Sequence, residues 1–217
     1  MSWVQTILLG CCMLFLVSVA SAGSNKQTEE LQSADFQEMV VTGNIKSKKL
    51  NEVSGIAPSR MMEDRYWVLN DGGNPERLYL IDASGALYLS VKIKGIKNRD
   101  WEDLSSFTMA GISYLMIADV GDNRSKRDDI ALHIIAEPDI TKLADMRSSV
   151  SLKPKATIHL RFEDGPRDCE AVAVDVKRKR ILLVSKRTTP PVLYEAPLRL
   201  TSTTGSIIVR RIAEIND

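Results

Sequence analysis

Short apolar stretches recur along the chain in a fixed order. Three of them follow an acidic residue, in Glu52–Ala57, Asp100–Ser105 and Asp168–Ala173. Counting 19 residues from each acidic start leads to positions 71, 119 and 187, where a second apolar run has just ended. Equal offsets in three places indicate an internal repeat, and each acidic start is predicted to open the first strand of a repeat unit.

Each repeat unit is predicted to contain four strands. The second strands are expected at residues 66–69, 114–117 and 181–184, the third at 77–81, 130–135 and 192–194, and the fourth at 88–93, 157–162 and 206–210. Apolar and polar residues alternate in the fourth strands, as in strands with one buried face. Turn residues such as 82–85 separate the runs, which favours antiparallel hairpins over parallel strands joined by helices.

Four short strands in about 40 to 50 residues are typical of a β-propeller blade. We therefore predict an all-β fold with blades near residues 50–96, 99–163 and 167–212 and the start of a fourth at 213. A propeller usually has about four to eight blades. Three blades would be part of a ring that we expect to be six-bladed. Either the chain is a truncated, non-functional fragment, or copies of it form a homo-oligomer that covers the open blade faces.

The second unit is longer than the first, because the acidic starts at 52, 100 and 168 are separated by 48 and 68 residues. The surplus is an insertion near residues 139–154. Ile140, Leu143 and Met146 are spaced at three residues within it, which predicts a short surface helix.

The first 22 residues carry no charged side chain and end in Ala20-Ser21-Ala22, a pattern typical of a cleaved signal peptide. An uncleaved membrane anchor and a lipoprotein site at Cys11 are the alternatives. Residues 23–38 are expected to be flexible and 39–217 to form the folded part. We predict a secreted or periplasmic protein that is free of the membrane after cleavage.

Composition, charge and cysteine content narrow the class of protein further. The 217 residues are 44% hydrophobic and 26% charged, as in an ordinary globular domain. The 29 basic and 28 acidic residues are spread along the chain, so nucleic acid is not an expected partner. Cys169 is the one cysteine left after signal cleavage, so no internal disulfide is expected.

The repeat also arranges the polar residues. In antiparallel neighbours, the start of the first strand and the end of the second lie at the same edge. We therefore expect one channel mouth to gather candidate ligand- or metal-binding residues: Glu52, Asp71, Asp100, Glu102, Asp119, Asp122, Asn123, Asp168 and Glu170. Two cations, Lys186 and Arg187, are expected at the same mouth. Converging oxygens of this kind suit Ca²⁺.

A structural role is the alternative for the recurring carboxylates, because Asp and Glu at strand starts often accept backbone N–H bonds. On that interpretation, the residues that interrupt the repeat are better functional candidates: Asp122 with Asn123, and Lys186 with Arg187. Trp67 and Trp101 are expected in the core. With only His133 and His159, a zinc or Ser-His-Asp site is poorly supported. The thiolate of Cys169 is disfavoured by its acidic neighbours, which argues against a nucleophile.

These motifs resemble a known family. The segments that carry the resemblance are Glu52 to Ala57, Trp67 to Asp71, Asp100 to Asp103, Asp119 to Arg124, Arg127, and Glu137-Pro138. They are similar to those of the secreted phytase-like or esterase-like β-propeller proteins, over roughly residues 50–217. The resemblance implies a Ca²⁺-associated, phosphoester-directed site at the acidic rim, and such a site needs basic residues to hold the anion, for which Lys186, Arg187 and Arg124 are the candidates.

Two functions follow as hypotheses. The first is an exported propeller that binds a cation or a small polar ligand at the rim without established catalysis. The second is a calcium-dependent phosphoesterase that uses the same carboxylates to position metal, water and substrate. The catalytic residues of such an enzyme are not identified by the sequence.

Overall fold

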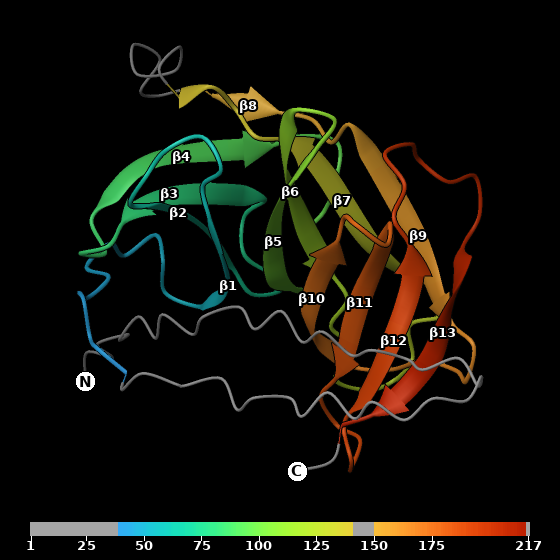
Figure 1. Cartoon of the computed structure of the whole chain (residues 1–217). Helices are drawn as coiled ribbons and strands as arrows, with labels where there is room; N and C mark the ends of the chain where they lie inside the picture. The colour runs from blue at the N-terminus through green and yellow to red at the C-terminus, as the bar shows by residue number, and fades with distance from the viewer. Residues whose placement is uncertain (1–38, 141–149, 216–217) are drawn as a thin grey trace, which may run out of the picture.

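The computed structural model describes residues 39–140 and 150–215, and over these residues the protein is all-β. Its strands form two sheets, one of five strands and one of eight, with no α-helix in the described residues (Figure 1). The eight-stranded sheet curls until its edge strands pack against each other, so it is nearly closed and barrel-like. Over the same residues, the search for a helix able to span a membrane finds none.

The first repeat unit is an antiparallel meander. It comprises β1 (Val53–Pro58), β2 (Arg65–Asn70), β3 (Arg77–Asp82) and β4 (Leu87–Ile93). Each strand pairs with the next, as expected for strands joined by short turns. The two-residue strand β8 (Ser151–Leu152) pairs in parallel with β4 and completes the five-stranded sheet.

The other two units have the same order of pairing. The second comprises β5 (Trp101–Met109), β6 (Ile112–Asp119), β7 (Ile130–Ala136) and β9 (Ala156–Phe162). The third comprises β10 (Cys169–Asp175), β11 (Arg180–Ser185), β12 (Val192–Pro197) and β13 (Ile207–Glu214). A short parallel pairing of β13 with β9 joins them into the eight-stranded sheet. All twelve strands predicted from the repeat are confirmed, with ends that differ by a few residues.

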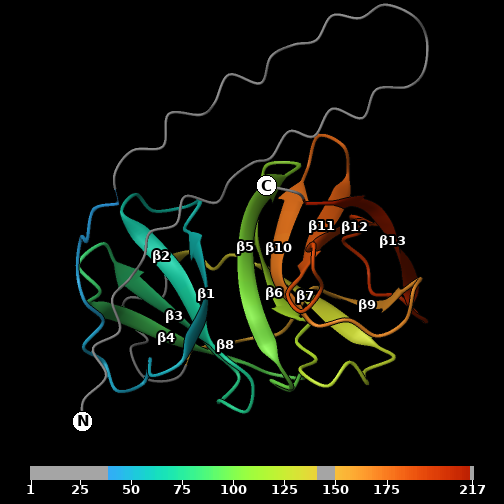
Figure 2. The same cartoon turned by 90° about the horizontal axis from the view of Figure 1, so that it is seen from below.

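The core lies between successive units. Strand β5 is central, and both β1 and β10 pack against it (Figure 2). Trp67 and Trp101 are fully buried in the cluster shared by the first two units, which confirms their predicted place in the core. Phe162 and Tyr194 meet edge to face, with ring centroids 4.8 Å apart, in the cluster shared by the second and third units.

The structure differs from the predictions in the insertion of the second unit and at the end of the third unit. The helix predicted within 139–154 has its middle, 141–149, outside the described residues, and the insertion's last part carries β8 and not a helix. The residues expected to start a fourth unit, Ala213 and Glu214, instead end β13, where they pair with Leu193 and Val192. The last strand is longer than its alternating pattern indicated, because pairing with β12 continues past the predicted end at 210.

The first strand of every unit contains a β-bulge at the same place. The register shifts between Val53 and Gly55 in β1, between Trp101 and Asp103 in β5, and between Cys169 and Ala171 in β10. The extra residues are therefore Ser54, Glu102 and Glu170. A bulge re-aims side chains relative to a regular strand, and in the second and third units the residue concerned is a glutamate.

Candidate functional site

The predicted gathering of carboxylates at one edge is present in part. Two groups of three acidic residues form there, and in each group the carboxylate oxygens lie within 4.8 Å of one another. One group is Asp71, Asp100 and Glu102, and the other is Glu102, Asp168 and Glu170. We call these five residues the carboxylate cluster. Asp71 directly follows β2, Asp100 and Asp168 directly precede β5 and β10, and Glu102 and Glu170 are the second residues of these two strands, so all three units contribute to the cluster.

Glu102 is the centre of the carboxylate cluster, since it belongs to both groups. Its side chain is buried, with a relative exposure of 6%. Burial raises the pKa of Glu102 to about 8, and the neighbouring charges of Glu170, Asp71 and Asp100 add to the rise. At neutral pH the protein therefore holds a proton on Glu102.

Two glycines allow the backbone to approach the cluster closely. A Cβ on Gly121 would lie 2.4 Å from Oε1 of Glu102, and a Cβ on Gly72 would lie 2.4 Å from Oδ1 of Asp100. No other residue type fits either position without moving these carboxylates. Burial, followed by the charge of Asp71, raises the pKa of Asp100. The sequence analysis missed both glycines, although each stands within two residues of a predicted site aspartate.

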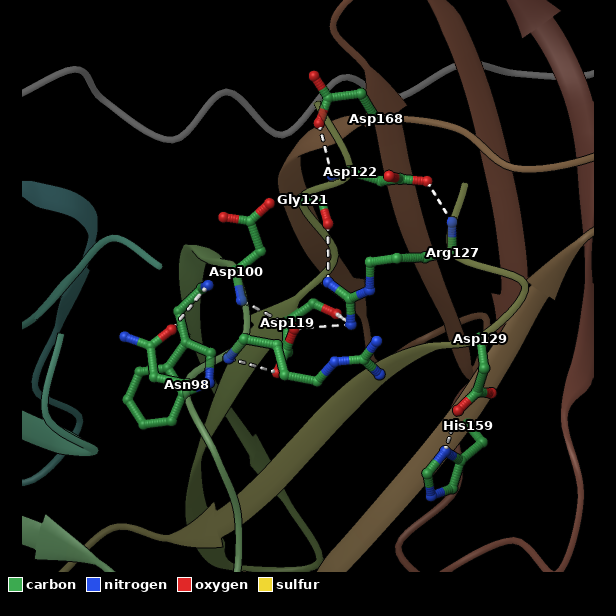
Figure 3. Close-up of polar contacts among 11 residues, drawn as sticks. Asn98, Asp100, Asp119, Gly121, Asp122, Arg127, Asp129, His159 and Asp168 are labelled. Carbon is green, nitrogen blue, oxygen red and sulfur yellow. Dashed lines mark hydrogen bonds and ion pairs between the residues drawn. The ribbon is translucent and has the colours of Figure 1, made fainter. Parts of the chain in front are cut away.

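Asp119 lies outside the carboxylate cluster and has a structural role. Its Oδ1 is 2.8 Å from Nη2 of the Arg127 guanidinium, and its carboxylate also accepts backbone N–H bonds from Arg99 and Asp100 (Figure 3). The Arg127 guanidinium further donates to the carbonyl of Gly121 at 2.7 Å. Asp119 and Arg127 therefore hold the loop after β6 against the start of β5.

Asp122 is also held by its own contacts. Its Oδ2 accepts the backbone N–H of Arg127 at 2.7 Å, and its own N–H donates to Oδ1 of Asp168 at 2.8 Å (Figure 3). The side chain is buried and belongs to neither group of the carboxylate cluster. Asp122 thus ties the loop to the third unit, whereas the sequence analysis had ranked it as a functional candidate.

The predicted anion-binding pair of the third unit lies against the cluster. Lys186 donates from Nζ to Oε1 of Glu170 at 2.7 Å, and Arg187 donates from Nε to Oδ2 of Asp168 at 2.7 Å. Arg187 also donates to the side chain of Asn123. The hydrogen bond with Glu170 raises the pKa of Lys186, so its ammonium stays charged. Two cations therefore offset part of the negative charge at this edge.

The remaining predicted site residues stand apart from the cluster. Glu52 is exposed and accepts a hydrogen bond from Nδ2 of Asn74 at 2.7 Å. Arg124 is exposed, and neither it nor Glu52 belongs to the two carboxylate groups. The position equivalent to Glu102 in the first unit is Ser54, whose hydroxyl donates to the carbonyl of Trp101 at 2.8 Å. The first unit therefore contributes to the site through Asp71.

Glu137, one of the motif residues, joins the first two units. Its carboxylate accepts hydrogen bonds from the hydroxyl of Ser59 at 2.5 Å, the N–H of Arg60 at 3.0 Å and the indole N–H of Trp67 at 2.9 Å. The residue is buried at the opposite ends of these strands from the cluster. Glu137 therefore has a structural role at the junction of the first two units.

The two histidines are held by hydrogen bonds, and the cysteine is buried. His133 is bonded through Nδ1 to the Thr157 hydroxyl at 3.0 Å, and burial lowers its pKa to about 4. His159 pairs with Asp129 at 2.8 Å (Figure 3). Cys169 is fully buried, and burial together with the charge of Asp168 raises the pKa of its thiol.

The donor set of the cluster suits a hard divalent cation. Ca²⁺ takes oxygen ligands at about 2.3 to 2.6 Å, so two ligands on opposite sides of the ion are about 4.6 to 5.2 Å apart. Carboxylate oxygens within 4.8 Å of one another therefore lie at a separation that one Ca²⁺ spans.

Comparison with known proteins does not identify the chain: no family model matches it, and no curated protein is significantly similar to it.

Proposed function

We propose that this protein binds Ca²⁺ at the carboxylate cluster. The observation that carries the proposal is the position of Glu102, a buried side chain shared by two carboxylate groups to which all three repeat units contribute. Asp71, Asp100, Glu102 and Glu170 would supply most of the ligand oxygens. Asp168 is less available, because Asp122 and Arg187 already occupy its two oxygens.

Electrostatics supports the same proposal. Five carboxylates at one edge repel one another, and two cations, Lys186 and Arg187, offset only part of that charge. Burial beside these charges keeps a proton on Glu102. A divalent cation supplies the missing positive charge and makes the ionised form of Glu102 favourable, so binding and proton release are coupled.

The test is a calorimetric titration of the 217-residue chain with Ca²⁺, before and after Glu102→Gln. Gln keeps the shape of the protonated side chain and removes its charge, so we expect the affinity for Ca²⁺ to fall about 100-fold, as for loss of a central charged ligand. Glu52→Gln is the matched control, because Glu52 carries the same charge near the edge but lies outside the cluster. Equal binding by Glu102→Gln and the unaltered protein would overturn the proposal.

A calcium-dependent phosphoesterase is the second candidate. It is favoured by Lys186 and Arg187, whose charged groups are within hydrogen-bond distance of the candidate ligands Glu170 and Asp168. When bound, Ca²⁺ would supply positive charge to polarise a phosphoryl oxygen. If these carboxylates bind Ca²⁺, Lys186 and Arg187 would be able to hold a phosphate group beside the ion.

Turnover separates the two candidates. The enzyme hypothesis expects calcium-dependent release of phosphate from an aryl phosphate, and its loss in Lys186→Gln/Arg187→Gln with Ca²⁺ binding retained. Calcium binding without any turnover would favour the non-catalytic protein. Both outcomes are read from the same preparation, by calorimetry and by phosphate release.

The proposal also covers the type of fold and the association of the chain with itself. We propose that the three meanders are propeller blades, on the strength of their equivalent bulges and the packing of β1 and β10 on β5.

Apolar side chains of the third unit, Leu182 and Val184, lie outside the core clusters and are half-buried. A second copy of an exported chain would cover such a face. Light scattering after gel filtration tests this, with a monomeric mass contradicting it.

A further inference from the structure

One face of the third repeat unit is open within the described residues, although the same face is buried in the first two units. The register after each bulge defines equivalent positions, because one residue of the second strand pairs there with Gly55, Asp103 or Ala171. These equivalent residues are Leu69, Ala118 and Val184. Two positions earlier in the same strands stand Trp67, Met116 and Leu182.

The first two units bury these positions against a neighbouring unit. Trp67 and Leu69 are fully buried in the hydrophobic cluster that the first unit shares with the second. Their equivalents in the second unit are fully buried in the cluster shared with the third. Leu182 and Val184 instead are half-buried and belong to no core cluster. The third unit therefore presents to solvent the face that the other units bury.

This face has the composition of a protein–protein interface. Two exposed alanines of β10 pair with the two apolar residues of β11. At one end of the face, Arg180 forms an ion pair with Glu195 at 3.1 Å. An apolar centre with charged residues at its edge is typical of an interface between proteins. We call the four central residues the open face: Ala171, Ala173, Leu182 and Val184.

The equivalents of Ala171 show what such a face contacts. Gly55 lies so close to β5 that a Cβ there would be 2.7 Å from the backbone nitrogen of Leu104. Asp103, at the same position of the second unit, accepts the backbone N–H of Val172 in β10 at 2.7 Å. In both units a strand of another sheet therefore packs on this position. The small side chain of Ala171 leaves room for the same kind of contact.

The opposite face of the first unit is not available to the open face of a second copy. Leu50, from the segment before β1, packs there in a cluster with Val68 and Ile81 and has an exposure of 3%. The N–H of Asn44 also holds this segment by donating to the carbonyl of Ser84 at 3.1 Å. Burying charged groups against apolar side chains is costly, which disfavours a head-to-tail contact on this segment. Three of its lysines are exposed: Lys46, Lys48 and Lys49.

We infer that the protein forms a two-fold symmetric dimer in which the open faces of two copies pack against each other. Each open face then covers the apolar residues of the other, and the segment before β1 stays in place. A two-fold contact uses the same patch on both copies and is closed, so it does not extend into a filament. Because this dimer rests on the self-association proposed above, its test separates the arrangement of the copies from association itself.

Opposite charges at Leu182 test the two-fold arrangement. We expect Leu182→Lys and Leu182→Glu each to raise the dissociation constant of the dimer about 30-fold or more, as for a residue at the centre of an interface. An equimolar mixture of the two variants should dimerise again, because a two-fold axis brings the unlike charges together. Recovery also shows that both variants are folded. Ile112→Lys is the matched control, because Ile112 is an exposed apolar residue of β6 outside the open face.

Cross-linking provides a second measurement. In a two-fold dimer, Ala171→Cys or Ala173→Cys should form a disulfide with the same residue of the second copy. Ala86→Cys is the control, because Ala86 is exposed in the first unit, and the unaltered chain gives the background from its own cysteines. A monomeric mass of the unaltered protein in light scattering would contradict both the association and the dimer. A dimer that shows neither recovery in the mixture nor a link between equal residues would overturn the two-fold arrangement alone.

Discussion

Two sets of carboxylates lie at the same edge of this protein and differ in what surrounds them. Asp119 and Asp122 each accept hydrogen bonds from N–H donors of Arg127 and the backbone. Glu102 and Asp100 instead face other carboxylates, and burial raises the pKa of both. Asp119 and Asp122 therefore have hydrogen-bond donors beside them, whereas too few positive groups lie near Glu102 and Asp100 to balance the negative charge there. The residue type alone therefore does not separate a structural carboxylate from a candidate ligand.

The difference comes from position relative to the bulges. Glu102 is the extra residue of the bulge in β5, and Glu170 is its equivalent in β10. Asp119 ends β6, where the following loop returns Arg127 to it. A carboxylate that is paired stabilises the folded state, and one that is crowded by like charges favours a proton or a cation. This difference between paired and crowded carboxylates can be tested by four experiments.

The largest effect is expected from Asp119→Ala. It leaves the guanidinium of Arg127, which has a side-chain exposure of 12%, without its carboxylate. Breaking a buried ion pair in this way costs about 3 to 5 kcal/mol, to be measured by urea unfolding. Asp128→Ala is the matched control, because Asp128 pairs with Arg161 at 3.7 Å on the surface, and its loss should cost less than about 1 kcal/mol. Similar losses in both variants would contradict the distinction.

The next effect concerns Asp103, which links β5 to β10 by accepting the N–H of Val172 at 2.7 Å. Burial raises its pKa from 3.8 to about 6, although two N–H donors oppose the rise. The folded state therefore holds this proton more tightly than the unfolded chain. Its contribution to stability is present below about pH 4 and is lost as the pH rises through about 6, by at most about 3 kcal/mol.

Unfolding measured from pH 2 to 7 checks this sign. Asp103→Asn should remove that part of the pH dependence, whatever it does to stability at a single pH. Asp175→Asn is the control of opposite sign, because the N–H of Arg178 lowers the pKa of Asp175. The contribution of Asp175 is present above about pH 4 and is lost as the pH falls further. A steeper decline with pH in Asp103→Asn would contradict the assignment.

A smaller effect is expected from pH on calcium binding. The pKa of Glu102 is raised to about 8, so Ca²⁺ must displace its proton at neutral pH. We expect the affinity to rise about tenfold between pH 7 and pH 9, with close to one proton released per ion bound at pH 7. Calorimetry in two buffers of different ionisation enthalpy measures the released proton. Binding that is independent of pH over this range would show that Glu102 is not a ligand.

The smallest effect is expected from Lys186→Gln. The ammonium of Lys186 is half exposed and pairs with Glu170, so its removal should change the free energy of unfolding by less than about 1 kcal/mol. The same change removes a cation that competes for the cluster, and we expect Ca²⁺ affinity to rise by a few-fold. Weaker calcium binding in this variant would indicate that Lys186 supports the site and does not compete for it.

Much of the fold could be predicted from the chain alone. The alternation of apolar residues and the equal spacing of acidic starts located all twelve strands of the three meanders. The sequence-based predictions were less accurate for segments whose structure depends on which strand they pair with. Glu214 looked like a new acidic start, but pairing with Val192 makes it the end of β13. The insertion had helical spacing, yet its last part adds to the edge of β4 as β8.

The candidate site was predicted less completely. Residue type and register predict that five acidic residues lie at one edge, and the structure places them together there: Asp71, Asp100, Glu102, Asp168 and Glu170. The same reasoning also selected Asp119 and Asp122, because donors supplied by Arg127 from the following loop leave no periodic pattern.

By itself, the sequence determined the strand content, the order of the strands and the edge at which acidic residues gather. These features follow from local periodicity and from the rule that antiparallel neighbours share an edge. The packing of the three units settled which carboxylates receive donors and which lie close together around Glu102. It did so because hydrogen bonding and burial depend on residues far apart in the chain, here Asp71, Gly121 and Glu170, which meet only when the three units pack.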